Sequence, residues 1–452
     1  MKDLLSDAAR RSIRYLESLD GRPVFPPAAA RARLDGLGGP LPDGPCDPGA
    51  VLALLDELAS PATVASAGRR YFGFVTGGAL PVTVAASWLA TSWDQNGFSA
   101  TTSPAVATLE QIALGWLLDA LNLPRGAAGA FVTGATMANL TALAAARRAV
   151  LAGAGWDVEE HGLQGAPALR VVLGAEAHPT VKKALGLLGL GRASASIVPC
   201  DAQGRMRAAA LPALDGPTIV CIQAGNVNSG AFDPAAEICA AAHAAGAWVH
   251  VDGAFGLWAQ AAPSRAHLAA GVADADSWAT DAHKWLNVPY DSGLAFVRDG
   301  AALRGAMSIT AAYLPHASLR EPGDFTPEAS RRARAVEVWA ALRSLGRSGL
   351  ADLVERTCRF AARFASVLLD AGAEILNDVV LNQVVVSFGD EARNRAVLAR
   401  VADDGTCWCG PTVWRGRTAL RISVSSWATT ADDVERSLAA ILRAAGLNQG
   451  AA

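Results

Sequence analysis

The feature that most constrains the fold is an alternation of short apolar runs with helical patterns between residues 104 and 297. The runs are continuously apolar, which is typical of parallel strands buried on both faces. The sequence therefore predicts an α/β fold with a mostly parallel seven-stranded sheet and helices on both faces. Helices are expected over 104–123, 137–151, 179–188 and 234–244. Strands are expected over 130–132, 170–173, 197–198, 218–222, 247–251, the run within 276–281, and 293–297.

Polar residues stand where several of these predicted strands end. They are Thr133, His178, Asn226 and Asp252. In sheets of this kind, ligands bind beyond the carboxyl ends of the strands. We therefore expect the functional site at that edge of the sheet.

Changes in pattern predict three domains. Residues 1–70 form an N-terminal helical arm, with helices to about residue 19 and over 50–58 and too little core to fold alone. Residues 71–345 form the large α/β domain, which ends in a long helix over 327–345. Residues 346–452 form a small α+β domain with strands near 383–387 and 419–424 and a helix over 430–444.

Charge and cysteine usage narrow the class of partner. The 452 residues carry a net charge of −3, with no long basic cluster, so we expect a small-molecule partner and neither nucleic acid nor a membrane surface. The N-terminus carries acidic residues and lacks an unbroken apolar core, so neither a signal peptide nor a membrane span is expected. Seven cysteines without a framework spacing favour a cytoplasmic location. Cys407 and Cys409 are interpreted as ordinary partly buried thiols, and no metal site is expected.

One lysine, Lys284, is placed for chemistry. It follows an apolar run and has His283 beside it, while Asp252 ends the predicted strand some thirty residues upstream. An acid at a strand end followed by His-Lys is the layout of a pyridoxal phosphate (PLP) enzyme. There the lysine forms a Schiff base and the carboxylate keeps the pyridine nitrogen protonated. Ala254, just after the acid, is small enough for a flat ligand to lie against it.

A turn of small residues offers a place for a phosphate ester. Gly134, Ala135 and Thr136 follow a predicted strand and open a helix, so backbone N–H groups, a hydroxyl and the helix dipole converge there. An ordinary structural turn has the same composition. His178, at another helix entrance, either caps that helix or stacks on the pyridine face opposite Ala254, where it contacts a substrate carboxylate.

Taken together, these motifs resemble those of the group II PLP-dependent decarboxylases. This fold type I family includes the aromatic-amino-acid, glutamate and histidine decarboxylases. The resemblance covers about residues 71 to 346 and rests on the order and spacing of its motifs. The matching stretches are 71–74, 103–110, 133–139, 177–179, 230–234, 250–254 and 283–286.

The resemblance implies a role for each site residue. Lys284 is implied as the Schiff-base lysine, Asp252 as the partner of the pyridine nitrogen, and His178 as the stacking residue. An obligate homodimer is also implied, with the N-terminal arm over the partner subunit. The implied PLP-binding residues are Gly134, Ala135, Thr136, His178, Asn226, Asp252, Ala254, Asp281, His283 and Lys284. The implied substrate pocket includes Phe74, Val75 and Thr76.

The chain departs from the family at the step after CO2 leaves. Family members place a tyrosine that reprotonates Cα in the loop expected between Pro315 and Phe325. This chain has four tyrosines, at 15, 71, 290 and 313, and none falls in that interval. His316 is the substitute acid that we expect. Asp281 also stands where many members have asparagine.

Three functional hypotheses follow. The first is decarboxylation of an L-amino acid to its amine and CO2. The second, favoured by slow reprotonation, is an aldehyde synthase or an aldolase-type carbon–carbon lyase. The third is a non-catalytic assembly protein with the same fold. An apolar or aromatic substrate side chain is favoured by Phe74, Val75, Trp408, Trp414 and Trp427, whereas an acidic one would suit Arg415, Arg417 and Arg421.

Overall fold

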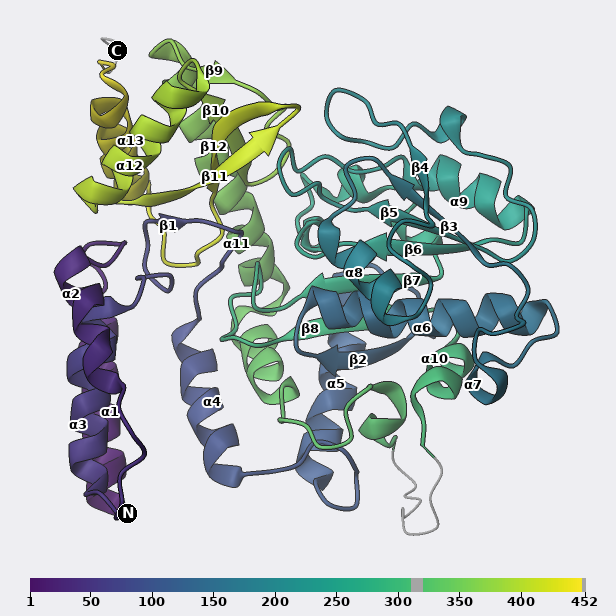
Figure 1. The fold of residues 1–452 in the computed structure, drawn as a ribbon, viewed down its shortest axis with the longest axis horizontal. Coiled ribbons are helices and arrows are strands. Elements are labelled where there is room, and N and C mark those ends of the chain that lie inside the picture. The colour runs from purple at the N-terminus through teal and green to yellow at the C-terminus, as the bar shows by residue number, and fades with distance from the viewer. Residues whose placement is uncertain (310–319, 449–452) are drawn as a thin grey trace. The chain divides into compact units, whose positions relative to one another are not determined.

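The structure, a computed structural model, describes residues 1–309 and 320–448. Two compact units make up the chain, and each is described by itself (Figure 1). The first unit comprises Met1–Thr76, Phe360–Leu376 and Val384–Ala452. The second comprises Gly77–Arg359 and Asn377–Gln383. The three-domain division at residues 70 and 345 stays a prediction.

The second unit contains the seven-stranded sheet, whose strand order is β2-β8-β7-β6-β5-β3-β4. Every neighbouring pair is parallel except the two pairs that involve β8. All residues of β5, β7 and β8 are buried, so both faces of the sheet are covered. The predicted α/β architecture is confirmed. The strands are β2 Ala128–Val132, β3 Arg170–Gly174, β4 Ser196–Val198, β5 Thr218–Gln223, β6 Trp248–Asp252, β7 Ser277–Asp281 and β8 Gly293–Val297.

Helices connect and cover these strands, and the four that were predicted here are present. Proline occupies the first turn of α5 and of α8, where its fixed φ suits a helix start and its missing N–H costs nothing. The α-helices of this unit are α4 Pro81–Trp93, α5 Pro104–Ala120, α6 Ala135–Gly153, α7 Val158–His161, α8 Pro179–Leu187, α9 Ala235–Ala244, α10 Gly300–Met307 and the first part of α11, Ala335–Asp370.

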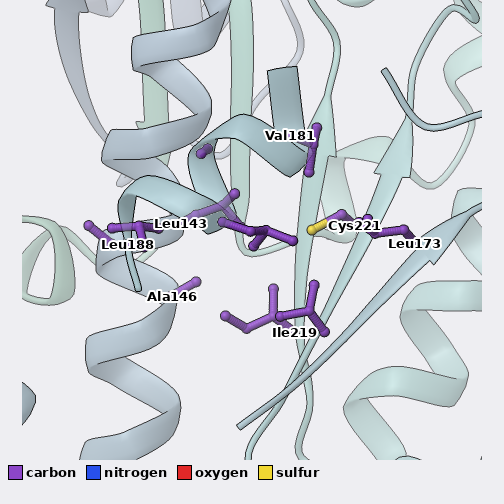
Figure 2. Packing of buried hydrophobic residues seen from close by; sticks show 11 residues of the cluster. Leu143, Ala146, Leu173, Val181, Leu188, Ile219 and Cys221 are labelled. Carbon is purple, nitrogen blue, oxygen red and sulfur yellow. The ribbon is translucent and has the colours of Figure 1, made fainter. Parts of the chain in front are cut away.

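A buried apolar cluster attaches α6 and α8 to the sheet (Figure 2). Leu143 of α6 and Val181 of α8 pack with Ile219 and Cys221 of β5, and none of the four is more than 4% exposed. Burying one large aliphatic side chain stabilises a fold by about 1.5–3 kcal/mol. The cluster therefore fixes two helices whose N-terminal ends carry predicted site residues.

The predicted helix over 327–345 is displaced in the structure. Helix α11 spans Ala335–Asp370, with a break at Gly346, whose φ of 59° lies in the left-handed region. Residues 327–334 are not helical. The local sequence favours a helix there, but Arg331 turns inward to a buried acid, and this long-range ion pair overrides the local preference.

That acid is Glu110 of α5, which is 1% exposed. It pairs with Arg331 and, at 3.0 Å, with Arg320. Arg331 also donates to the Phe131 carbonyl at 3.0 Å, and Arg320 donates to the Gly129 carbonyl. Both carbonyls belong to β2, so the two arginines hold the strand that leads into the turn at residues 133–136.

The first unit contains a five-stranded sheet of order β1-β11-β12-β10-β9. The predicted strands near 383–387 and 419–424 and the helix over 430–444 are confirmed, while α12 and β11 were not predicted. The strands are β1 Tyr71–Phe72, β9 Glu374–Ile375, β10 Gln383–Ser387, β11 Trp408–Trp414 and β12 Arg417–Ser423. The helices are α1 Lys2–Ser18, α2 Ala28–Ala32, α3 Pro48–Ala59, α12 Glu391–Asp404 and α13 Ala431–Ala445.

Helices α1 and α3 pack against each other, joined by an Arg11–Asp56 ion pair at 3.0 Å. Neither helix contains a buried residue. None of the described helices is long and apolar enough to cross a membrane. Apolar side chains that stay 40–59% exposed on this helix pair are Leu5, Ile13, Leu16, Val51, Leu54 and Leu55.

Candidate active site

The lysine end of the site is organised by Asp281, the last residue of β7. Lys284 Nζ lies 2.9 Å from Asp281 Oδ2, and the other carboxylate oxygen, Oδ1, accepts the Ala135 backbone N–H at 2.5 Å. Asp281 is 2% exposed. One buried carboxylate therefore connects the candidate lysine to the first turn of α6, and three of the predicted site residues are together.

His283 completes this end. Its Nδ1 accepts the Ser292 backbone N–H at 3.1 Å, and its Nε2 lies 3.6 Å from Asp281 Oδ1. Burial lowers the pKa of His283, which favours the neutral imidazole. Because Nδ1 accepts a hydrogen bond, the single proton of the neutral ring belongs on Nε2, which faces Asp281.

The turn before α6 is tightly packed from the other side. A Cβ atom on Gly293, the first residue of β8, would lie 2.3 Å from the Gly134 Cα, so only glycine fits there. The close approach fixes the turn that precedes Ala135 and Thr136. Backbone N–H groups at the start of the 19-residue helix α6, together with the helix dipole, suit a phosphate ester.

Asp252, the last residue of β6, is 5% exposed. Its carboxylate accepts from the Ala254 N–H at 3.3 Å and from Asn139 Nδ2 at 3.4 Å. Burial raises the pKa of Asp252, while the positive charges of His178 and Lys284 oppose that rise. The acid, the lysine and the histidine that the sequence singled out therefore act on one another electrostatically.

His178 lies at the start of α8, just beyond β3. Its Nδ1 accepts the Thr180 N–H at 3.4 Å and lies 2.7 Å from the Thr180 hydroxyl, so it caps the helix. It also lies close enough to Asp252 to oppose the rise in the pKa of that acid. Capping the helix and lying close to Asp252 are therefore compatible for His178. Its stacking on the pyridine ring stays a prediction.

Asn226 follows β5 at the same edge of the sheet. Its Oδ1 accepts from the Asn228 and Ser229 N–H groups at 2.9 and 3.2 Å. Its buried Nδ2 has no hydrogen-bond partner among the described residues. Leaving a buried donor unpaired costs about 1–3 kcal/mol, which makes this atom a candidate contact for an acceptor on a bound ligand.

These features fit PLP. One compact unit contains all the groups that PLP requires: a lysine beside a carboxylate, a second buried carboxylate for the pyridine nitrogen, a helix N-terminus for the phosphate and an unpaired donor. The Ala254 carbonyl, two residues after Asp252, accepts the Asp281 N–H at 2.9 Å and so connects the chain segments that carry the two carboxylates.

The predicted substrate residues belong to the first unit. Phe74 is 59% exposed, and its ring lies 5.7 Å from that of Trp408. Phe74 and Val75 both have left-handed backbone angles, with φ of 54° and 57°, which are strained for such residues. Thr76 is buried, and burial lowers the pKa of Arg421 in β12. Contact of these four with a substrate stays a prediction.

One expected catalytic residue, His316, lies outside the described residues. Two buried polar residues near Asp252 had no role assigned to them from the sequence. His250 and Asn139 stand inside matched motifs, but the hydrogen bond between their side chains is apparent only in the structure. Gly77, which precedes α4, packs closely against the backbone at Lys284. A Cβ atom there would lie 1.8 Å from the carbonyl oxygen of Lys284.

The fold and the site define a PLP-dependent enzyme of fold type I. Residues 63–388 match the family model of the pyridoxal-dependent decarboxylase conserved domain. The chain belongs to this family, its cofactor is PLP, and it is an enzyme of the carboxy-lyase class.

Individual relatives agree with the family match. Aromatic-L-amino-acid decarboxylase from Sus scrofa is 30% identical over 442 residues, covering 91% of this chain and 89% of the relative. Phenylacetaldehyde synthase from Arabidopsis thaliana is 28% identical over 360 residues, covering 73% and 72%. The crystal structure of Oryza sativa TDC with PLP and tryptamine superposes with a TM-score of 0.90 at 25% identity, covering 98% of this chain and 97% of that one.

Proposed function

We propose that this protein removes the α-carboxylate of an L-amino acid as CO2 and releases the corresponding amine. The observation that carries the proposal is the pairing of Lys284 with Asp281 in the same unit as the buried carboxylate of Asp252, in a chain of the decarboxylase family. This arrangement provides an attachment point and a counter-charge for the cofactor.

Each residue has a defined task in this reaction. When bound, PLP supplies a sink for the electron pair left at Cα as CO2 departs. Asp252 holds a proton at the ring nitrogen, and Lys284 holds the cofactor. Thr136, next to the Ala135 N–H that donates to Asp281, and the α6 dipole bind the phosphate. His178 orients the substrate carboxylate, because the bond to be broken must stand perpendicular to the ring.

We propose an aromatic or large apolar side chain on the substrate. In the first unit, the ring of Trp408 stacks on Tyr71, with centroids 5.2 Å apart, and on Phe74, with centroids 5.7 Å apart. The three rings form an aromatic surface at Phe74, which is one of the predicted pocket residues. Arg417, one candidate for an acidic substrate, already pairs with Glu374 at 2.8 Å. The relative named aromatic-L-amino-acid decarboxylase supports the same class.

A panel of L-amino acids tests the proposal. Full-length protein loaded with PLP is incubated with aromatic, aliphatic and acidic L-amino acids, and CO2, amine, aldehyde and ammonia are measured in one reaction. Equal amounts of CO2 and amine from an aromatic substrate are expected. Lys284→Ala should release neither. CO2 only from acidic substrates would contradict the substrate class, and no CO2 from any substrate would contradict the reaction.

An aldehyde synthase is the second candidate. The match to phenylacetaldehyde synthase supports it, as does the lack of a tyrosine between residues 315 and 325. The same assay separates the two reactions, because an aldehyde synthase consumes oxygen and yields aldehyde and ammonia in place of amine.

We also propose that the active unit is a homodimer. The α1–α3 pair of the first unit and helix α4 of the second each leave large apolar side chains exposed, including Trp88 and Trp93 of α4 at 43% and 44%. A second copy of the chain would remove these surfaces from water. Sedimentation at assay concentration should show a dimer, and deleting residues 1–60 should abolish both dimer and activity. An active monomer would contradict this.

A cytoplasmic location is part of the same proposal. All seven cysteines lie in the described residues as free thiols, which suits a reducing compartment. Fractionation of the source cells with an antibody against the chain would test it.

A further inference from the structure

Behind Asp252, a row of buried side chains runs toward the opposite edge of the sheet. Asn139 lies in α6, His250 lies in β6 two residues before the acid, and Ser277 begins β7. All three are 0% exposed. Trp248, the first residue of β6, ends the row. None of these four residues has a task in the proposed reaction.

The hydrogen bonds of this row have one consistent direction. Asn139 Nδ2 donates to Asp252 Oδ2 at 3.4 Å, so Asn139 Oδ1 faces His250 Nε2 at 2.9 Å. A carbonyl oxygen only accepts, and therefore Nε2 carries the histidine proton. His250 Nδ1 then accepts from the Ser277 hydroxyl at 2.9 Å, and the Ser277 oxygen accepts the Trp248 indole N–H at 2.9 Å.

With Asp252 ionised, as a protonated PLP ring requires, the reverse orientation of the Asn139 amide is unfavourable. It would place a carbonyl oxygen against the carboxylate of Asp252 and an NH2 group against His250. Two acceptors facing each other in a buried site would leave the acid without this donor. Burial lowers the pKa of His250 to about 3, so the imidazole remains neutral and supplies one donor and one acceptor.

We propose that Asn139 and His250 are positioning residues that hold Asp252 as a carboxylate directed at the ring nitrogen of PLP. The inference deepens the proposed function and rests on it, because the charge on Asp252 matters only if the ring must stay protonated. Burial on its own favours the neutral acid, since it raises the pKa of Asp252. The Asn139 N–H, which His250 holds in place, donates to the carboxylate and offsets this effect of burial.

The row orients the acid and does not conduct protons. It ends at an indole N–H, which donates but does not ionise at ordinary pH, so no proton can be delivered from that end. The other titratable groups close to Asp252 are His178, Lys284 and Cys221. All three remain in the variants described next.

The test follows the protonation of the cofactor ring rather than catalysis. Full-length protein is loaded with PLP labelled with 15N in the ring, without substrate, and the 15N chemical shift is recorded between about pH 6 and pH 9. His250→Leu removes both hydrogen bonds of the imidazole, whereas the matched variant His250→Gln retains one donor and one acceptor. We expect His250→Leu to lower the pKa of the ring nitrogen by about one to two units, a tenfold to hundredfold change, and His250→Gln to retain the wild-type titration.

An unchanged titration in His250→Leu would overturn the proposal. An equal shift in His250→Leu and His250→Gln would also overturn it, because the effect would then come from packing. If His250→Leu does not fold, Ser277→Ala decides. It should shift the titration in the same direction by a smaller amount, and no shift would overturn the proposal. Because no substrate is present, a supporting titration combined with no CO2 release from any amino acid would reject only the proposed reaction.

Discussion

Replacing Glu110 with alanine should lower the free energy of unfolding by about 3–5 kcal/mol, because it removes the counter-charge of two arginines. The side chains of Glu110 and Arg331 are each 1% exposed, and that of Arg320 is 19% exposed. At the 3.0 Å Arg320–Glu110 distance, the attraction between unit charges is about 5.5 kcal/mol for an effective dielectric of about 20. Desolvation offsets part of this gain in the wild type, but the variant retains the desolvation cost of both arginines.

Urea unfolding of the PLP-loaded protein measures the effect. The midpoint should fall while the slope stays constant, since the surface exposed on unfolding is unchanged. The matched control is Glu435→Ala, which breaks an ion pair with Arg363 whose side chains are 53% and 45% exposed. Such exposed pairs contribute about 0.2–1 kcal/mol. If Glu110→Ala shifts the midpoint no more than the control does, the assignment of a buried charge cluster is refuted.

The remaining predictions concern the site and pH. Asp252→Asn should retain PLP binding yet slow turnover by orders of magnitude, because the ring nitrogen loses its proton; near-normal turnover would remove the acid from the mechanism. Asp281→Asn should tighten binding of PLP about tenfold or more relative to binding of pyridoxal, which has no phosphate, because a carboxylate beside the phosphate is removed. Any effect through the ion pair with Lys284 applies to both ligands, so equal changes for both in fluorescence titrations would argue against this repulsion. Burial raises the pKa of Asp233 from 3.8 to about 6, so between these pH values the folded state binds more protons than the unfolded state. The free energy of unfolding of the wild type should therefore fall, relative to that of Asp233→Asn, as the pH rises from about 4 to 6. A flat difference between their urea midpoints would contradict this. His316→Phe should raise aldehyde relative to amine; unchanged product ratios would mean that another group protonates Cα.

Local pattern was sufficient for most of the fold. The strands of the large sheet were predicted because continuous apolar runs are a local property. The strand β11 was missed because Gly410-Pro411 is a turn signal. The strand tolerates this proline because β1 pairs with β11 only at Trp408 and Cys409, so the residues beyond them lie at the edge of the sheet on that side. The start of α11 was misplaced because Arg331 binds an acid 221 positions away.

The site could be placed from the sequence, but its internal contacts could not. The register of the parallel strands sets Gln223 beside Asp252 and Asp252 beside Ala279, so the residues just beyond these strands share one edge of the sheet. That much follows from predicting parallel strands. The roles of Asn139 and His250 depend instead on side-chain directions between a helix and a strand, which no spacing in the sequence encodes.

The contact between Asp281 and the Ala135 N–H has a topological cause. Strand β8 is inserted between β2 and β7 and runs opposite to both, and Gly293 at its start pairs with Val132 on one side and with Asp281 on the other. The carboxyl ends of β2 and β7 are therefore only one strand apart. Because Gly293 has no side chain, the turn after β2 can lie against it, and the Ala135 N–H reaches Asp281 at 2.5 Å. A mostly parallel sheet was predicted without saying which strand is reversed, so the sequence could place the lysine and the phosphate turn at one edge but could not join them through Asp281.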